Sequence, residues 1–314
     1  MNASTSVCRT TAFILMLNLT ISQLYANEKR ENGHIEWGAS PRHHYQFVPS
    51  EGTPSYKWVM EREKEKSFKL KYSHASLPTK FDFSQDINVI HTQGNLGSCT
   101  AQTLTLSLEY YLKKFGISVE LSPLFVYFNE RRLNGTINED CGASLTDAIR
   151  AVYKYGACLE QSWTYTDDET KFKITPPDNT YSEARSLFRG IRLIHTNIPH
   201  QLQNIKQSLA DKTPVFCGIN VFPSFEHQET KKTGIIPMPT AIEKPIGAHA
   251  ITLIGYDDAT KHFKFVNSRG KEWGDNGFGY LPYKYFTNKN PHNVRLHTYP
   301  KELWSITLIR RATS

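Results

Sequence analysis

Cysteine is scarce in this sequence, and long hydrophobic runs are absent beyond its N-terminal region. The 314 residues include five cysteines, of which Cys8 lies close to the N-terminus. The chain also has no internal repeats, no low-complexity tracts and no module of interleaved basic and aromatic residues. We therefore expect neither a repeat protein nor a nucleic-acid partner, and no contact with a membrane beyond the N-terminal region.

What is present is an ordinary globular composition. Aromatic residues make up 12% and charged residues 21% of the chain, which is long enough for one large core or two modest ones. The net charge is +7. Part of this excess lies between residues 57 and 71, where glutamates are scattered among the lysines, which is typical of a solvated helix face or a docking segment.

The first 26 residues have the pattern of a secretory signal peptide. Arg9 precedes the apolar run 12–21, and the small residue Ala26 follows as the expected cleavage point. The alternatives, a membrane anchor or a buried N-terminal helix, are weaker because the apolar run is too short to span a bilayer. The sequence therefore predicts a secreted or periplasmic protein.

Residues 27–76 differ from the rest of the chain. They are rich in His, Lys and Glu and carry seven isolated aromatic residues, and a helix is plausible from about Ser55 to Lys69. Such a segment has too little apolar surface to fold alone, so we expect it to dock on the remainder, with a boundary near Leu77. It either covers a site and is cut away, or remains as a fixed subdomain.

Residues 77–314 predict an α+β fold with a helical part followed by a β-rich part. Apolar residues at helical spacing indicate helices at about 99–115, 121–132 and 145–155, the last with Ser144 and Asp147 suited to its first turn. From about residue 191 the chain shows six strand patterns separated by turns, interrupted by one amphipathic helix near 199–209.

The stretch QGNLGSCTAQT places a single thiol at the start of a helix. Ser98 suits the N-cap position, so Cys99 lies in the first turn, where the positive end of the helix dipole favours a thiolate. Gly94 and Gly97 allow the backbone to approach a ligand closely. A small buried core cysteine is the alternative, and a reactive thiol needs a base and an oxyanion donor elsewhere in the chain.

Two further residues have the spacing that such a thiol requires. His249 opens the apolar run GAHAITLIGYDD and lies 150 residues after Cys99, and Asn267 follows the next strand. The spacing is close to that of a papain-type nucleophile and base, and slightly long for the asparagine. A histidine that leads a buried strand is otherwise often a hydrogen-bonded core residue.

With these residues in place, the chain resembles the papain-like cysteine peptidases over about 77–310. The resemblance rests on five ordered blocks: QGNLGSC, LSPLFVYFNERR, SLTDAIRAVYKYGACLEQSWTY, GAHAITLIGYD and NSRGKEWGDNGFGY. The residues in these blocks are most similar to those of a bacterial branch of this family. The resemblance implies a two-lobed fold, with a helical N-terminal lobe, an antiparallel β-barrel-like C-terminal lobe and the active site in the cleft between them.

The resemblance also implies a role for each site residue. Cys99 is the expected nucleophile, His249 its partner and general acid, and Asn267 the residue that orients the imidazole. Gln93 and the backbone N–H of Cys99 are expected to form the oxyanion hole. The residues expected to line the substrate cleft are Gly97, Ser98, Gly142, Ala143, Ala248 and Trp273.

Three positions depart from the family's pattern. Leu96 replaces a cysteine of the usual disulfide, so Cys141 lacks its expected partner. Thr100 replaces a tryptophan after the nucleophile. Arg269 replaces a tryptophan that shields the hydrogen bond between the histidine and the asparagine, which brings charge close to Asn267.

The pairing of the remaining cysteines stays open. Cys141 and Cys158 flank the helix 145–155 and should lie too far apart to pair. A bridge between Cys158 and Cys217 and three unpaired thiols are both compatible with the sequence.

We therefore expect a secreted, monomeric papain-like protease, made as a zymogen, that needs no metal or cofactor. It would cleave a protein or peptide substrate, with its own residues 27–76 as a candidate inhibitor. The alternative is a weak or inactive homologue that binds peptides or a partner protein, which only Arg269 favours. A transglutaminase-like acyltransferase shares the chemistry but fits the Gln93 block and Asn267 poorly.

Overall fold

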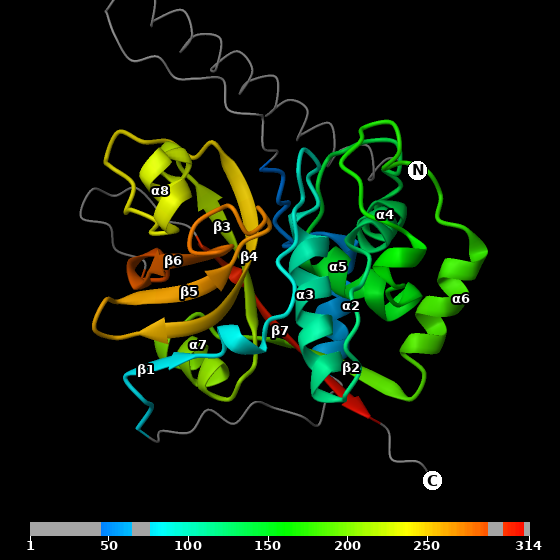
Figure 1. Ribbon diagram of the computed structural model, residues 1–314, viewed down its shortest axis with the longest axis horizontal. Coiled ribbons are helices and arrows are strands. Elements are labelled where there is room, and N and C mark those ends of the chain that lie inside the picture. The colour runs from blue at the N-terminus through cyan, green and yellow to red at the C-terminus, as the bar shows by residue number, and fades with distance from the viewer. Residues whose placement is uncertain (1–44, 65–75, 288–297, 311–314) are drawn as a thin grey trace, which may run out of the picture.

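Two lobes meet along the helix that begins at Cys99 (Figure 1). The computed structural model describes residues 45–64, 76–287 and 298–310. The predicted signal peptide, residues 1–26, lies outside this part of the chain. Within it, no helix combines the length and the apolar character needed to cross a membrane.

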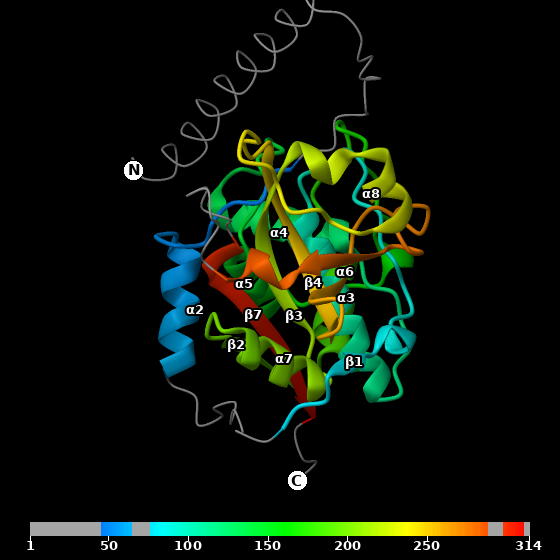
Figure 2. The same ribbon diagram turned by 90° about the vertical axis from the view of Figure 1, so that its left-hand side faces the viewer.

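Most of the helices form one lobe, while the last two, α7 (Leu202–Ala210) and α8 (Gln228–Thr233), lie beside the strands of the other lobe (Figures 1 and 2). The other described α-helices are α2 (Pro54–Lys64), α3 (Cys99–Lys114), α4 (Pro123–Asn134), α5 (Leu145–Tyr155) and α6 (Asp178–Leu187). Short 3-10 helices span Ser84–Asp86, Glu160–Ser162, Pro223–Glu226 and Tyr283–Tyr285. Helices α3, α4 and α5 contact one another and form the centre of the helical lobe.

An antiparallel sheet forms the other lobe and reaches under the helices. Its strands are β1 (Lys80–Asp82), β2 (Ile191–Asn197), β3 (Val215–Val221), β4 (Gly247–Asp257), β5 (His262–Val266), β6 (Phe278–Pro282) and β7 (Thr298–Arg310). The order is β2-β7-β3-β4-β5-β6, with β1 paired to the end of β4. The α+β prediction is confirmed. The sheet is open in the described residues, where a barrel-like arrangement was expected.

Helix ends follow the capping residues in two of the three predicted helices. Ser144 and Asp147 form a reciprocal capping box that starts α5 as predicted. Ser122 caps α4 and Pro123 occupies its first turn, so this helix begins two residues later than predicted. Ser98 precedes α3 but its side chain makes no cap hydrogen bond, contrary to expectation.

The polar segment before the boundary docks on the helical lobe. Helix α2 contacts α5 and β2, and Val59 in its centre is fully buried. The carbonyl of Val59 lies 3.0 Å from Nε2 of His195, and the Trp58 and Tyr153 rings pack edge to face at 5.3 Å. The docking that the composition predicted is therefore present, with α2 ending at Lys64 in the described chain.

A buried ion pair fixes the loop that leads into the Cys99 helix. Nε2 of His91 lies 3.0 Å from Oε2 of Glu109 on α3, and both side chains are 7% exposed. The other carboxylate oxygen of Glu109 accepts the N–H of Leu121 at 2.7 Å. Burial alone lowers the pKa of His91, but the attraction and hydrogen bond of Glu109 outweigh it and raise the pKa above its usual value.

This pair should make stability pH-dependent. Because the folded pKa of His91 is raised, its contribution is fully present below the unfolded pKa of about 6.5 and is lost as the pH rises through the folded value. We predict that Glu109→Gln lowers the free energy of unfolding by about 3 kcal/mol at pH 6. It should also flatten the decline toward pH 9, measured by urea unfolding.

The exposed Glu272 offers a matched control, because Glu272→Gln makes the same charge change at the surface. That variant should keep the stability and the pH slope of the wild-type protein. An unchanged slope in Glu109→Gln would contradict the assignment to the buried pair.

Candidate active site

Cys99 is the first residue of α3 and its side chain is fully buried. Ser98, the residue before it, directs its hydroxyl to the hydroxyl of Tyr165 at 2.6 Å. The same Tyr165 hydroxyl donates to the carbonyl of Gln93 at 2.8 Å. Tyr165 therefore ties together the two ends of the loop that carries the thiol, a role that the sequence reasoning missed.

His249 and Asn267 form a hydrogen-bonded pair on the opposite lobe. Nε2 of His249 lies 2.9 Å from Oδ1 of Asn267, and both residues are buried. The backbone N–H of Ser268 also donates to this Oδ1, at 2.9 Å. Because an N–H needs an acceptor, the oxygen assignment is fixed, so Nε2 of His249 carries the proton that it donates. Proton exchange between the imidazole and another group therefore takes place at Nδ1.

The Gln93 side chain is held by hydrogen bonds at both ends. Its Oε1 accepts from the hydroxyl of Ser268 at 2.6 Å, and its Nε2 donates to the carbonyl of Leu96 at 2.9 Å. The backbone N–H of Gln93 donates to the carbonyl of Ser268 at 2.9 Å. These bonds join the loop before α3 to the residue after Asn267, and they leave Nε2 with a second hydrogen.

The thiol and the histidine strand come together where α3 meets β4. Helix α3 contacts β4, and the backbone of Ala250, the residue after His249, acts to lower the pKa of the Cys99 thiol. On the other side of α3, the Thr100 hydroxyl donates to Oε2 of the buried Glu130 at 3.0 Å. Burial raises the pKa of the Glu130 carboxyl well above its usual range.

The chain's own residues 45–48 run between the two lobes at this place. The N–H of Phe47 donates to the carbonyl of Ala248 at 3.1 Å, and the N–H of Val48 donates to the carbonyl of Ala143 at 3.0 Å. Gln46 pairs with Ala248 as a parallel bridge. The segment therefore joins both predicted cleft walls through backbone hydrogen bonds.

Two glycines are needed for this close approach. A Cβ on Gly142, which has φ +70°, would lie 1.7 Å from the carbonyl oxygen of Gln46. A Cβ on Gly218 in β3 would lie 2.4 Å from the Phe47 ring. Phe47 is only 5% exposed and fills the space over Gly218. Close packing against these two glycines therefore holds the segment in place, in addition to its backbone hydrogen bonds.

A buried carboxylate anchors the next turn of the segment. The Ser50 hydroxyl donates to Oε2 of Glu302 at 2.8 Å, and the Ser50 backbone N–H donates to the other carboxylate oxygen. Burial raises the pKa of Glu302 to about 7, although the bonds from Ser50 act in the opposite direction. The Ser50 hydroxyl also lies 3.3 Å from the N–H of Thr146 at the start of α5.

The predicted cleft residues fall into two groups. Gly97, Gly142, Ala143 and Ala248 all lie against residues 45–48, and Ser98 lies next to Gly97 with its hydroxyl paired to Tyr165. Trp273 instead stacks on Phe225 at 5.8 Å inside the β-rich lobe, and Phe225 packs against the His249 ring at 6.4 Å. Trp273 is therefore separated from the cleft by one aromatic ring.

The Cys99 thiol is neutral in this arrangement. Burial raises the pKa of Cys99 to about 12, and the hydrogen bond from the Ala250 backbone offsets only part of the increase. The thiolate expected from the helix N-terminus is therefore disfavoured while the site is covered, because desolvation outweighs the favourable dipole. Cys141, Cys158 and Cys217 are likewise free thiols.

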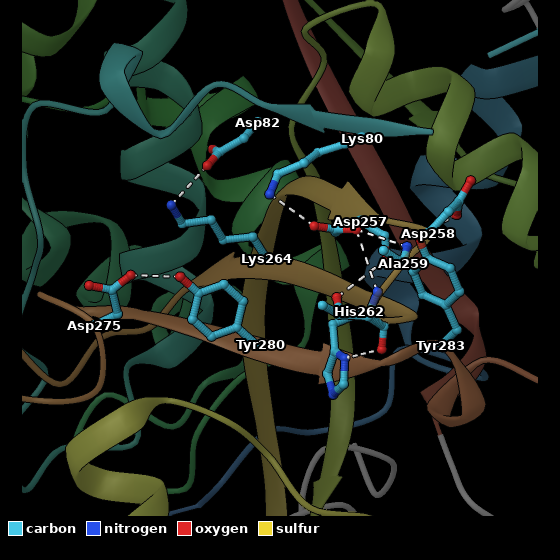
Figure 3. Close-up of polar contacts among 11 residues, drawn as sticks. Lys80, Asp82, Asp257, Asp258, Ala259, His262, Lys264, Asp275, Tyr280 and Tyr283 are labelled. Carbon is cyan, nitrogen blue, oxygen red and sulfur yellow. Dashed lines mark hydrogen bonds and ion pairs between the residues drawn. The ribbon is translucent and has the colours of Figure 1, made fainter. Parts of the chain in front are cut away.

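A separate cavity of about 410 Å³ lies at the opposite end of β4 from His249; Figure 3 shows polar contacts among the residues that line it. Its charged side chains are paired, Lys80 with Asp257 at 2.9 Å and Lys264 with Asp82 at 2.9 Å. None of the predicted catalytic residues lines this cavity. In the described part of the chain, no group of His, Cys, Asp and Glu side chains has the arrangement of a metal site.

Two lobes with a cysteine at a helix start on one side and a hydrogen-bonded histidine and asparagine on the other define the architecture of a thiol hydrolase. Residues 77–294 match the family described as papain family cysteine protease. The chain therefore belongs to the papain family of cysteine proteases, as the sequence blocks indicated.

Individual relatives agree with this assignment. The chain is 37% identical over 206 residues to an uncharacterized peptidase C1-like protein of Acanthamoeba polyphaga mimivirus, covering 63% of this chain and 65% of the relative. It is 24% identical to cysteine proteinase 3 of Solanum lycopersicum, covering 67% and 57%. The chain thus spans less than two thirds of either relative.

Solved structures show the same fold. Xylellain, a cysteine protease from Xylella fastidiosa, superposes with a TM-score of 0.68 at 26% identity, over 85% of this chain and 96% of that chain. The digestive procathepsin L 3 of Tenebrio molitor superposes with a TM-score of 0.56 at 15% identity, over 81% and 79%. The second likeness supports the fold alone.

The covered site leads to a prediction for thiol reactivity. Because the pKa of Cys99 is raised to about 12, we expect its alkylation by iodoacetamide to be slow at pH 7. The rate should rise about tenfold for each pH unit up to pH 9, since only the thiolate reacts. Peptide mass spectrometry resolves Cys99 from the half-buried Cys141, which serves as the internal reference. Fast, pH-independent labelling of Cys99 between pH 6 and 8 would contradict the neutral state.

Proposed function

We propose that this protein hydrolyses peptide bonds with Cys99 as nucleophile, His249 as acid and base, and Asn267 as the orienting residue. The observation that carries the proposal is the hydrogen bond of 2.9 Å between His249 Nε2 and Asn267 Oδ1. This bond engages Nε2 of the buried imidazole, so proton exchange during the reaction takes place at Nδ1. The start of α3 lies against the same strand.

The reaction follows from these positions. Nδ1 of His249 takes the proton of the Cys99 thiol as the sulfur attacks the peptide carbonyl carbon, and the carbonyl oxygen takes the negative charge. The C–N bond then breaks as His249 delivers its proton to the leaving amine, which leaves a thioester on Cys99. Water, deprotonated by His249, attacks the thioester and releases the acid and the free thiol.

The developing oxyanion needs donors that are already in position. Gln93 Nε2 has a second hydrogen, and its Oε1 is fixed by the Ser268 hydroxyl. The backbone N–H of Cys99 lies in the first turn of α3, where no intrahelical acceptor is available to it. Together they form the proposed oxyanion hole, in which a single donor contributes about 3 kcal/mol to the transition state.

Two substitutions separate these roles. Cys99→Ala should abolish both peptide hydrolysis and labelling by an epoxide thiol inhibitor, while the melting temperature changes little. Gln93→Ala should lower kcat on the order of 10²-fold and leave epoxide labelling nearly intact, because it serves the oxyanion and not the thiol. Persistent hydrolysis in Cys99→Ala would identify a different nucleophile.

We propose further that the protein is a secreted zymogen, with residues 27–76 as its inhibitory segment. The support is the backbone pairing of Phe47 with Ala248 and Val48 with Ala143, which occupies the donors and acceptors that a peptide substrate would use. Cys99 is fully buried, and this burial raises the pKa of its thiol to about 12. Helix α2 then braces the segment on the helical lobe.

The inhibitor proposal is tested by loosening the segment without removing it. Phe47→Ala deletes the ring over Gly218 and should weaken docking by about 3 kcal/mol. That change raises the population of the uncovered cleft on the order of a hundredfold. We predict a matching rise in the rate of peptide hydrolysis by the intact chain.

The matched control lies in the same segment but outside the cleft. Val59→Ala removes a buried side chain from α2 and should lower the melting temperature without raising turnover. If Phe47→Ala also melts earlier and cleaves no faster, the segment is a brace and not an inhibitor. The inactive-homologue alternative predicts that no variant hydrolyses any peptide or reacts with the epoxide.

A further inference from the structure

Arg269 is a buried cation next to the histidine side of the cleft. It follows Asn267 by two residues, and its side chain is 5% exposed. Its backbone pairs with that of Thr92, next to Gln93. The guanidinium carbon lies 4.7 Å from the centre of the Tyr45 ring, so the covering segment shields it from water.

The hydrogen-bonding capacity of this guanidinium is largely unused. Nη2 lies 3.6 Å from Oε1 of Glu226, which is too long for a hydrogen bond. Nε and Nη1 are buried and have no hydrogen-bond partner among the described residues. Burial lowers the pKa of Arg269 to about 10, so the group remains charged at neutral pH. Each edge of the guanidinium, Nε with Nη2 or Nη1 with Nη2, is suited to a carboxylate.

The one carboxylate nearby is shared among three groups. The Tyr45 hydroxyl donates to Oε1 of Glu226, and Nζ of Lys231 lies 2.9 Å from Oε2. Glu226 thus faces two cations, Arg269 and Lys231, and these three side chains carry a net charge of +1. One additional anion would bring the net charge of this cluster to zero.

The position of Tyr45 shows which part of a substrate would meet this cluster. Its ring packs edge to face on the His249 ring at 5.7 Å. His249 is the proposed proton donor to the leaving amine, so the Tyr45 space lies on the leaving-group side of the scissile bond. Phe47, by contrast, lies over Gly218 in β3. Departure of Tyr45 would open the space beside Arg269.

We propose that Arg269 sets a preference for a carboxylate immediately after the scissile bond. This inference rests on the proposed peptidase function. The carboxylate would take the place of the Tyr45 ring, accept from Nε or Nη1 together with Nη2 at one edge of the guanidinium, and balance the net charge of the cluster. It can come from an acidic side chain or from the terminal carboxylate of a short leaving peptide, and both sources have the same recognition chemistry.

The test uses quenched peptides that differ only after the scissile bond, cleaved by the full chain and by Phe47→Ala. One set carries Glu, Gln or Lys at that position. A second set ends there with a free or an amidated carboxyl terminus. We expect kcat/KM to be about tenfold or more higher for Glu than for Gln, and lowest for Lys. A preference for the free over the amidated terminus would assign the site to terminal carboxylates.

Variants of Arg269 connect the preference to this residue. Arg269→Gln should bring the Glu-to-Gln ratio of kcat/KM close to one, and Arg269→Lys should retain part of it. Lys271→Gln removes a charge from an exposed neighbour and should leave the ratio unchanged. Equal cleavage of the Glu and Gln peptides by wild type would overturn the proposal, and would indicate that Glu226 neutralises Arg269 once Tyr45 departs. Absence of all hydrolysis would instead refute the peptidase function.

Discussion

The contact between the start of α3 and the first half of β4 is the constraint on which the site depends. It brings Cys99 of the helical lobe against the strand that carries His249, although the two residues are far apart in the sequence. Hydrogen bonds on either side preserve the contact: Gln93 binds the backbone and hydroxyl of Ser268, and Asn267 holds the imidazole. A displacement of either lobe would separate the thiol from the strand that carries His249.

The covering segment changes the electrostatics of everything beneath it. Cys99 is fully buried, which raises the pKa of its thiol to about 12, and the segment's Tyr45 ring lies over Arg269 without supplying an acceptor for two of its nitrogens. Both groups are therefore in a state that favours departure of the segment or arrival of a substrate. The same residues that would catalyse and select the substrate are held in an unreactive state by the Tyr45–Val48 backbone.

The sequence predicted most of the scaffold because local signals are strong there. The capping box at Ser144 and the buried pattern of β4 specify their elements directly, and the order of motif blocks indicated the family. The predicted roles of the site residues stay predictions. The path of residues 45–48 had no such signal, since backbone pairing with Ala143 and Ala248 requires no particular side chain. The contacts of Arg269 could not be predicted from the sequence either, because Tyr45 and Glu226 come from distant parts of the chain.

The most direct test of the account is a crystal structure of the chain after reaction with an epoxide thiol inhibitor. The account predicts a covalent bond to Cys99, with the inhibitor backbone hydrogen-bonded to Ala143 and Ala248 and residues 45–48 displaced from between the lobes. An inhibitor bound to another cysteine, or one bound to Cys99 while Phe47 still covers Gly218, would contradict it.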